Sequence, residues 1–293
     1  MDQGQVPEGR LSVTVLGSGG PIPSSHRASS GYVIWLDGVP RLLVDAGGGT
    51  FVRMGELGLD VPLIDTVFLT HTHIDHTGGL APFVMAAYMA GRTTPLTISG
   101  PAGRDIHPGC TRFVDLLFGP RGAWSYMHTF DGFGIDPVEL PSDPRGETAT
   151  LVLEDGDLQI QSIAVPHGMM PSVGYRIDYA GASVVFSGDI QRRHQPFIDL
   201  AAGCDVLVHD QAVPEREVAH SHLHTKPSET ARVAREAGCH TLVLSHFMPE
   251  IDAELDGAVR IVEENFPGRV VVAYDLMTID VLLGTGAGTA KPC

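Results

Sequence analysis

Residues 67–80 read VFLTHTHIDHTGGL, and this stretch holds the densest group of candidate metal ligands in the sequence. An apolar run typical of a buried strand leads into three histidines and one aspartate within six residues. Imidazole and carboxylate groups are ligands for zinc, iron or manganese. In an extended loop alternate side chains point the same way, so His71, His73 and Asp75 should share one face while His76 points elsewhere. The spacing therefore predicts two neighbouring metal sites.

The composition excludes several classes of protein. The chain has 293 residues, 43% of them hydrophobic, which is enough for a sizeable core. Its formal net charge of −16 argues against nucleic acid as a partner, because holding a phosphate backbone needs a basic patch. No apolar run approaches the roughly 18 residues of a membrane helix. The four cysteines form no CxxC pair. We therefore expect a cytoplasmic protein with reduced thiols and no membrane partner.

Short apolar segments alternate with turns rich in Gly and Pro. The predicted strands are 11–16, 32–36, 41–45, 67–70, 96–99, 150–153, 158–165, 173–177, 183–187, 206–210, 241–245, 269–274 and 277–283. The predicted helices are 50–57, 79–90, 102–118, 196–202, 227–237 and 252–265. Residues 119–147 are either a lid over a site or an ordinary connection. We expect one domain over residues 11–283, with loose tails at 1–10 and 284–293.

Polar metal ligands follow apolar strands at five places in the chain. These places are the 71–76 loop, His167, Asp189, His209-Asp210 and His246. The strands before His71 and His246 share one design, an apolar run and then a hydroxyl residue. This repetition indicates two similar β-then-α halves with both histidines at one rim. The glycines at 47–49 fit neither a P-loop nor a dinucleotide fingerprint, so we interpret them as room for close backbone approach to the metal loop.

Together with Asp45, these residues resemble the metallo-β-lactamase superfamily over about residues 11–283. LGSGGP at 16–21, SGD at 187–189 and LSHF at 244–247 resemble its ribonuclease Z and arylsulfatase-like branch. The resemblance implies a four-layer αβ/βα sandwich around two divalent metal ions, usually zinc, with manganese or iron as alternatives. The implied ligands of the first metal are His71, His73 and His167, those of the second are Asp75, His76 and His246, and Asp189 bridges the two.

The resemblance also implies roles around the metals. Asp75 would orient the attacking hydroxide, and a histidine followed by a hydroxyl residue would donate the proton. His224-Thr225 fits that donor, and His222 remains a competitor. Asp45 and Asp210 would fix the tautomers of histidines. At position 210 the family usually carries Glu.

The function implied is hydrolysis of a small ester by a hydroxide that bridges two metals. Phosphodiester, aryl sulfate and lactone substrates all stay open. The apolar pair Met169-Met170 beside His167 favours an ester with a hydrophobic part. Ribonuclease Z enzymes insert a long tRNA-gripping arm where this chain has only residues 178–182, so we expect the arm to be absent. The alternatives are a tRNA 3′-processing endonuclease and an iron-dependent oxidoreductase that oxidises persulfides. A homodimer is left open.

Overall fold

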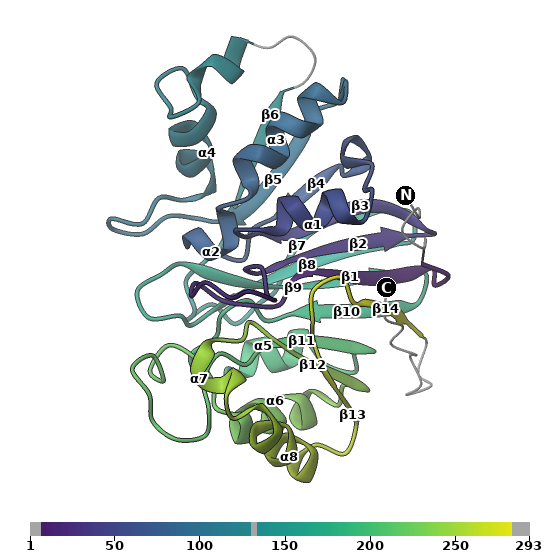
Figure 1. Ribbon diagram of the computed structural model, residues 1–293, viewed down its shortest axis with the longest axis vertical. Helices are drawn as coiled ribbons and strands as arrows, with labels where there is room; N and C mark the ends of the chain where they lie inside the picture. The colour runs from purple at the N-terminus through teal and green to yellow at the C-terminus, as the bar shows by residue number, and fades with distance from the viewer. Residues whose placement is uncertain (1–6, 130–133, 283–293) are drawn as a thin grey trace.

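Two facing sheets with helices on their outer sides make up the fold, as the computed structural model shows for residues 7–129 and 134–282 (Figure 1). Each sheet has seven strands, in the orders β14-β1-β2-β3-β4-β5-β6 and β13-β12-β11-β10-β9-β8-β7. Helices α1, α3 and α4 cover the first sheet, and α5, α6 and α8 cover the second (Figure 1). The predicted αβ/βα sandwich is confirmed. The two tails predicted to be loose lie mostly outside the described residues, at 1–6 and 284–293.

The element bounds are as follows. The first sheet contains β1 (Leu11–Gly17), β2 (Gly31–Leu36), β3 (Val39–Ala46), β4 (Thr66–Phe68), β5 (Leu96–Pro101), β6 (Ile135–Leu140) and β14 (Thr278–Val281). The second contains β7 (Thr150–Asp155), β8 (Leu158–Val165), β9 (Ser172–Tyr179), β10 (Ala182–Phe186), β11 (Val206–Asp210), β12 (Thr241–Ser245) and β13 (Arg269–Val272). The helices are α1 (Thr50–Glu56), α2 (Ile74–Thr77), α3 (Leu80–Met89), α4 (Cys110–Phe118), α5 (Gln195–Leu200), α6 (Pro227–Ala237), α7 (Pro249–Asp252) and α8 (Leu255–Asn265), with 3₁₀ turns η1 (Val61–Leu63) and η2 (Ser125–Thr129).

Each sheet begins antiparallel and continues parallel. Strands β3 to β6 run parallel in the first sheet, and β10 to β13 in the second. Strands β11 and β12 are buried along their whole length, which is typical of parallel strands covered on both faces. Because the carboxyl ends of parallel strands meet at one edge of a sheet, the residues that follow them gather there.

Aromatic side chains join the two sheets in the core. Tyr32 of β2 lies 5.2 Å from Phe186 of β10, measured between ring centroids. Phe68 of β4 lies 5.3 Å from Tyr175 of β9, whose buried hydroxyl donates to the carbonyl of Leu69 at 2.9 Å. Such tilted ring pairs add to the burial energy of the aromatic groups. The contact anchors the strand that carries the metal loop to the opposite sheet.

Two element predictions were wrong. The helix predicted at 102–118 starts only at Cys110, because residues 102–109 form a tight loop between Pro101 and α4. The segment 119–147 contains an edge strand, β6, which the pattern hid because Asp136, Pro137 and Glu139 interrupt its apolar residues. Proline is tolerated at a sheet edge, where its missing N–H is not needed. The helix predicted at 252–265 is confirmed as α8, which starts at Leu255, and the short helix α7 before it was not predicted.

The glycine interpretation is confirmed at Gly47. A Cβ atom there would lie 2.1 Å from the carbonyl oxygen of Asp75. No other residue fits this approach, so the glycine run lets the metal loop pack against the end of β3. Within the described ranges no helix has the length and apolar character to cross a bilayer. Cys110, Cys204 and Cys239 are buried free thiols.

Candidate metal centre

Asp45 at the end of β3 sets the course of the metal loop. Its carboxylate accepts the backbone N–H of Thr70 at 2.7 Å, the hydroxyl of Thr70 at 2.8 Å and the Nδ1 proton of His76 at 2.7 Å. Its own backbone is left-handed, with φ of 56°. Residues held in such conformations cluster at functional sites. One carboxylate therefore fixes both ends of the loop and the tautomer of His76.

The metal loop was expected to be extended over its whole length, but it is extended only as far as His73. Helix α2 begins directly after His73, so Asp75 and His76 lie on one helical turn. Asp75 consequently faces His246, with Oδ2 3.2 Å from Nε2, and does not share a face with His71 and His73. The face predicted from alternation was wrong because the strand-like period ends at residue 73.

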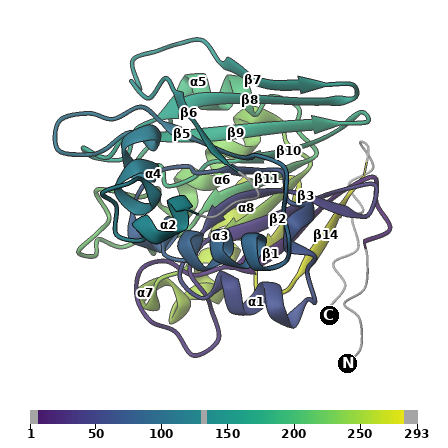
Figure 2. The ribbon, with the colours of Figure 1, turned by 90° about the horizontal axis from the view of Figure 1, so that it is seen from above.

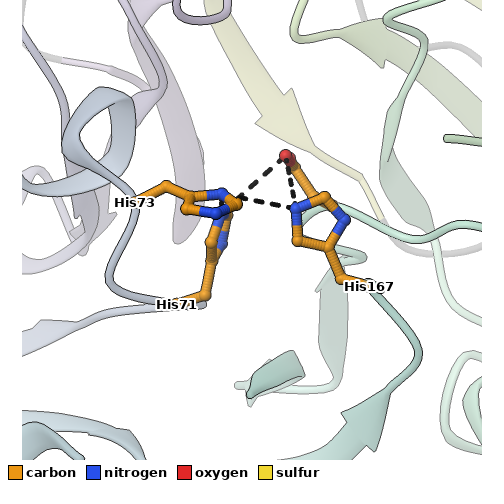
Figure 3. Close-up of side chains that lie close together, drawn as sticks. His71, His73 and His167 are labelled. Carbon is orange, nitrogen blue, oxygen red and sulfur yellow. Dashed lines mark hydrogen bonds and ion pairs between the residues drawn. The ribbon is translucent and has the colours of Figure 1, made fainter. Parts of the chain in front are cut away.

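The first ligand set contains three imidazoles from two loops. Nε2 of His71 lies 2.9 Å from Nδ1 of His73, and Nε2 of His167 lies 3.4 Å from the same atom. Figure 3 shows the three rings pointing toward one another. Oδ2 of Asp189 lies 3.8 Å from the His71 nitrogen and 3.5 Å from the His167 nitrogen. The ligand atoms of this set all lie within 4.8 Å of one another.

The second set is Asp75, His76 and His246. Nε2 of His76 and Nε2 of His246 lie 3.2 Å apart. The other oxygen of Asp189, Oδ1, lies 3.4 Å from each of these two nitrogens. Asp189 thus presents one carboxylate oxygen to each set. This is the position from which a carboxylate would bridge two cations.

These residues fit a pair of divalent metal ions. His76 uses Nδ1 for Asp45, so Nε2 is the atom that it offers to a metal. Oδ1 of Asp189 is buried and has no hydrogen-bond partner in the part of the chain that the structure describes. A buried carboxylate oxygen of this kind is costly without a cation beside it. Neutral imidazole and carboxylate ligands are the donors that zinc and similar ions take.

His224 lies beside the two metal sets. Its Nδ1 donates to Oδ2 of Asp210 at 2.8 Å, and its ring stands 5.5 Å from the rings of both His167 and His246. Asp210 is held in turn by the N–H groups of Ala212 at 3.0 Å and Ile190 at 3.2 Å. His224 is therefore fixed with its other nitrogen free for the centre.

Two other histidines considered from the sequence lie elsewhere. His222 is exposed, so it does not compete with buried His224 for a place at the metals. His209 points away from the rim: its ring packs against Phe197 of α5, at 6.2 Å between centroids. Successive side chains of a strand face opposite sides, so only Asp210 of that pair reaches the site.

Comparison with known proteins agrees with this geometry. The family model described as "Beta-lactamase superfamily domain" matches residues 40–247, which include both ligand sets. The chain belongs to the metallo-β-lactamase superfamily. Ribonuclease Z of Mycobacterium bovis (strain BCG / Pasteur 1173P2) is 30% identical over 287 residues, covering 92% of this chain and 98% of the relative. Ribonuclease Z of Mycobacterium avium (strain 104) is also 30% identical, over 284 residues, with the same coverage. This superfamily member therefore lies in the ribonuclease Z-like branch.

Solved structures share the fold of this superfamily member. The short form of human tRNase Z has a TM-score of 0.73 and 24% identity, and the match covers 92% of this chain and 99% of that one. The metallo-β-lactamase fold protein YhfI from Bacillus subtilis has a TM-score of 0.72 and 23% identity, with coverage of 92% and 98%. The family and the two ligand sets together identify a metal-dependent hydrolase.

The histidines of the two ligand sets differ in the direction of their pKa shifts. Burial lowers the pKa of His71 well below its ordinary value and lowers that of His167 to about 4, so both stay neutral at pH 7. Burial also acts on His76 and His246, but nearby carboxylates, Asp189 foremost, outweigh it and raise both pKa values. In the metal-free protein the second set therefore holds protons more tightly than the first.

Several groups around the centre could not be predicted from the sequence. The carbonyl oxygen of Leu223 accepts a hydrogen bond from Nδ1 of His167 at 3.2 Å and so fixes its tautomer. A backbone acceptor leaves no mark in the sequence. Arg104 donates to the carbonyl oxygen of Met169 at 2.7 Å and brings the β5–α4 loop to the site. Of the methionines expected at the pocket, Met169 is exposed and Met170 accepts from the hydroxyl of Thr72.

Proposed function

We propose that this hydrolase cleaves the phosphodiester bond of a small molecule that carries an apolar group. The observation that carries the proposal is the joining of seven ligand side chains into two sets through Asp189, with His224 fixed beside them. A pair of metal ions, which we propose to be zinc, would supply a Lewis acid and a water of lowered pKa. Manganese and iron suit the same ligands.

The residues of the chain would act on the substrate in defined ways. Asp75 carries its charge at neutral pH, because its histidine neighbours outweigh burial and lower its pKa to about 2. It would accept a hydrogen bond from the attacking water and orient it. His224 would protonate the leaving oxygen from Nε2. Burial disfavours the imidazolium form of His224, but Asp210 outweighs burial and raises its pKa to about 9, which keeps the proton available.

The relatives favour a phosphodiester over an aryl sulfate or a lactone. The curated proteins at 30% identity are named ribonuclease Z, and the bond that a ribonuclease breaks is a phosphodiester. The exposed side chain of Met169 lies close to His167 and offers an apolar surface to the substrate. Aryl sulfates and lactones are the comparison substrates of the test.

Two features support a small substrate over tRNA. Strands β9 and β10 are joined by only two residues, Ala180 and Gly181, and this short connection, where we expect a tRNA-gripping arm to be inserted, supports a small substrate. The net charge of −16 also disfavours a polyanion. The second candidate is a tRNA 3′-processing endonuclease, which the 30% identity over 92% of the chain favours.

The test combines metal analysis with a substrate panel. We expect two zinc ions per chain and turnover of bis(4-nitrophenyl) phosphate, with much slower turnover of 4-nitrophenyl sulfate and an aryl lactone. A precursor tRNA transcript with a 3′ trailer is the competing substrate. If the transcript is cleaved with a higher kcat/KM than the phosphodiester, the small-substrate proposal is wrong. One iron per chain with oxidation of a persulfide would replace hydrolysis altogether.

A further inference from the structure

The loop at residues 102–109 lies at the metal centre, yet the hydrolytic roles above do not use it. It joins β5 to α4 and projects at the same end of the molecule as α2 (Figures 1 and 2). Its tip is a closed turn in which the N–H of Arg104 donates to the carbonyl of His107 at 3.0 Å and the N–H of His107 donates back at 2.9 Å. Asp105 in the turn has a left-handed backbone, with φ of 54°. The tip is thus a defined turn.

Close packing at the base makes the loop rigid. A Cβ atom at Gly103 would lie 2.4 Å from the backbone nitrogen of Gly109. A Cβ atom at Gly109 would lie 2.4 Å from Oε1 of Glu139, which accepts the N–H of Thr111 at 3.3 Å. The two glycines therefore allow backbone contacts that close the loop and tie it to β6 and the start of α4.

The loop is attached to the segment that carries a metal ligand. Nη2 of Arg104 donates to the carbonyl oxygen of Met169 at 2.7 Å, two residues after His167. His167 belongs to the first ligand set. The turn therefore stands beside the first ligand set.

His107 and its neighbours leave binding groups without partners. Nδ1 of His107 is shielded from solvent and has no hydrogen-bond partner among the residues described. The ring as a whole is half-buried, so the nitrogen that a ligand can reach is Nε2. Next to it, Ile106 is 88% exposed and Met169 is 65% exposed. A polar nitrogen on a turn that also carries exposed Ile106 and is bonded to the Met169 backbone matches a ligand with an acceptor oxygen and an apolar group.

We propose that the turn Arg104–His107 is the substrate-specificity loop of this enzyme. In it, His107 is a positioning residue that donates from Nε2 to a non-reacting oxygen of the phosphodiester, and Ile106 contacts the apolar group that stays on the phosphorus. The substrate class is a phosphodiester with an aryl or similar apolar substituent. This inference rests on the proposed function, and binding measured without turnover separates the two.

The test compares two phosphodiesters with the same leaving group, 4-nitrophenyl phenyl phosphate and methyl 4-nitrophenyl phosphate. His107→Ala should lower kcat/KM for both by about tenfold, mainly through KM, because one hydrogen bond to a charged group is lost. His107→Gln should recover part of the loss, since its amide can donate. Ile106→Ser should raise KM about fivefold for the phenyl substrate only. Zinc content should stay at the parent level in all three variants.

His222→Ala is the matched control, because it removes an exposed histidine that lies outside this turn and away from the metals. Its kinetics should equal those of the parent. Calorimetric binding of diphenyl phosphate to the zinc-loaded protein provides the readout that needs no turnover. Equal affinity in the parent and His107→Ala contradicts the loop proposal, as does loss of zinc from His107→Ala. Binding with no turnover of any phosphodiester contradicts the proposed function and leaves the loop supported. If the parent neither binds nor turns over these compounds, both are wrong.

Discussion

Asp189 is the residue that joins the two ligand sets of this site. Each of its two carboxylate oxygens faces a different ligand set, at 3.4 to 3.8 Å from histidine nitrogens. Burial raises the pKa of this carboxyl, but His246 and His76 outweigh burial and hold it well below its ordinary value. It is therefore ionised before any metal arrives. The ionisation of Asp189 therefore depends on the histidines that surround it in the folded chain.

His73 and His224 lie at the same centre, but their replacement by alanine should affect metal content and turnover differently. His73→Ala should lose metal and turnover together, because it removes a ligand. His224→Ala should keep both metals and lose about 10²–10⁴-fold in rate, the typical contribution of a general acid. The loss should be larger for a phenolate leaving group than for 4-nitrophenolate, which leaves more easily without a proton. Metal analysis and kinetics check both variants.

His222→Ala is the control for that pair, since His222 is an exposed histidine two residues away. It should match the parent in metal content and rate. An unchanged rate in His224→Ala with both leaving groups would show that His224 is not the proton donor.

Metal loading should release more protons from the second ligand set than from the first. In the metal-free protein the pKa values of His76 and His246 are raised, whereas those of His71 and His167 are lowered. Metal binding should therefore displace more protons from the second set than from the first, so affinity there should fall more steeply as the pH drops. Titration calorimetry in buffers of different ionisation enthalpy measures the protons released. Two binding steps with no release would contradict the assignment.

At the scale of elements, the glycine run after β3 and the metal loop form one unit. Gly47→Ala places a Cβ against the carbonyl oxygen of Asp75, so the turn that carries Asp75 and His76 must shift. We expect a loss of about 1–3 kcal/mol in the free energy of unfolding, as for overpacked sites, together with weaker metal binding. Denaturant unfolding and metal titration measure the two effects.

Gly55→Ala in α1 is the matched control for that substitution. A Cβ atom there meets nothing within 4 Å, and the position is exposed. Alanine should stabilise the helix by about 0.5–1 kcal/mol without changing metal affinity. Metal binding that is as strong in Gly47→Ala as in Gly55→Ala would mean that the loop does not depend on this packing.

At the scale of the whole molecule, the centre joins the two halves of the chain. His71, His73, Asp75 and His76 belong to the half with the first sheet, and His167, Asp189 and His246 belong to the half with the second. Bound metals should therefore stabilise the interface between the sheets. At 100 times Kd, one site contributes about 2.7 kcal/mol. In a protein of this size that should raise Tm by about 5 °C or more.

Differential scanning calorimetry before and after removal of metal with a chelator tests this link. The parent should lose stability on chelation, and His73→Ala, which lacks one ligand, should lose less. A Tm that does not change on chelation would mean that bound metal does not stabilise the fold.

The edge of the first sheet shows where sequence patterns fail. Strand β6 was missed because its sequence, IDPVEL, lacks the apolar alternation of a strand packed on a core. It pairs with β5 from Leu96↔Ile135 to Pro101↔Leu140. The loop at 102–109 was taken for helix for a related reason: the contact between Gly103 and Gly109 exists only when the chain is folded.

The sequence by itself predicted the fold class and named the candidate metal ligands. The fold class and the candidate ligands can both be read from short segments, because the apolar strands are continuous and the ligands, such as His71 and His246, directly follow them. Only the tertiary structure decided which ligands act together, because Asp75 and His246 lie 171 residues apart in sequence and meet through the pairing of the sheets. It also decided between His224 and His222 and removed His209 from the site. Burial, hydrogen-bond partners and the facing of a strand are properties of the folded chain, and no single stretch of sequence contains them.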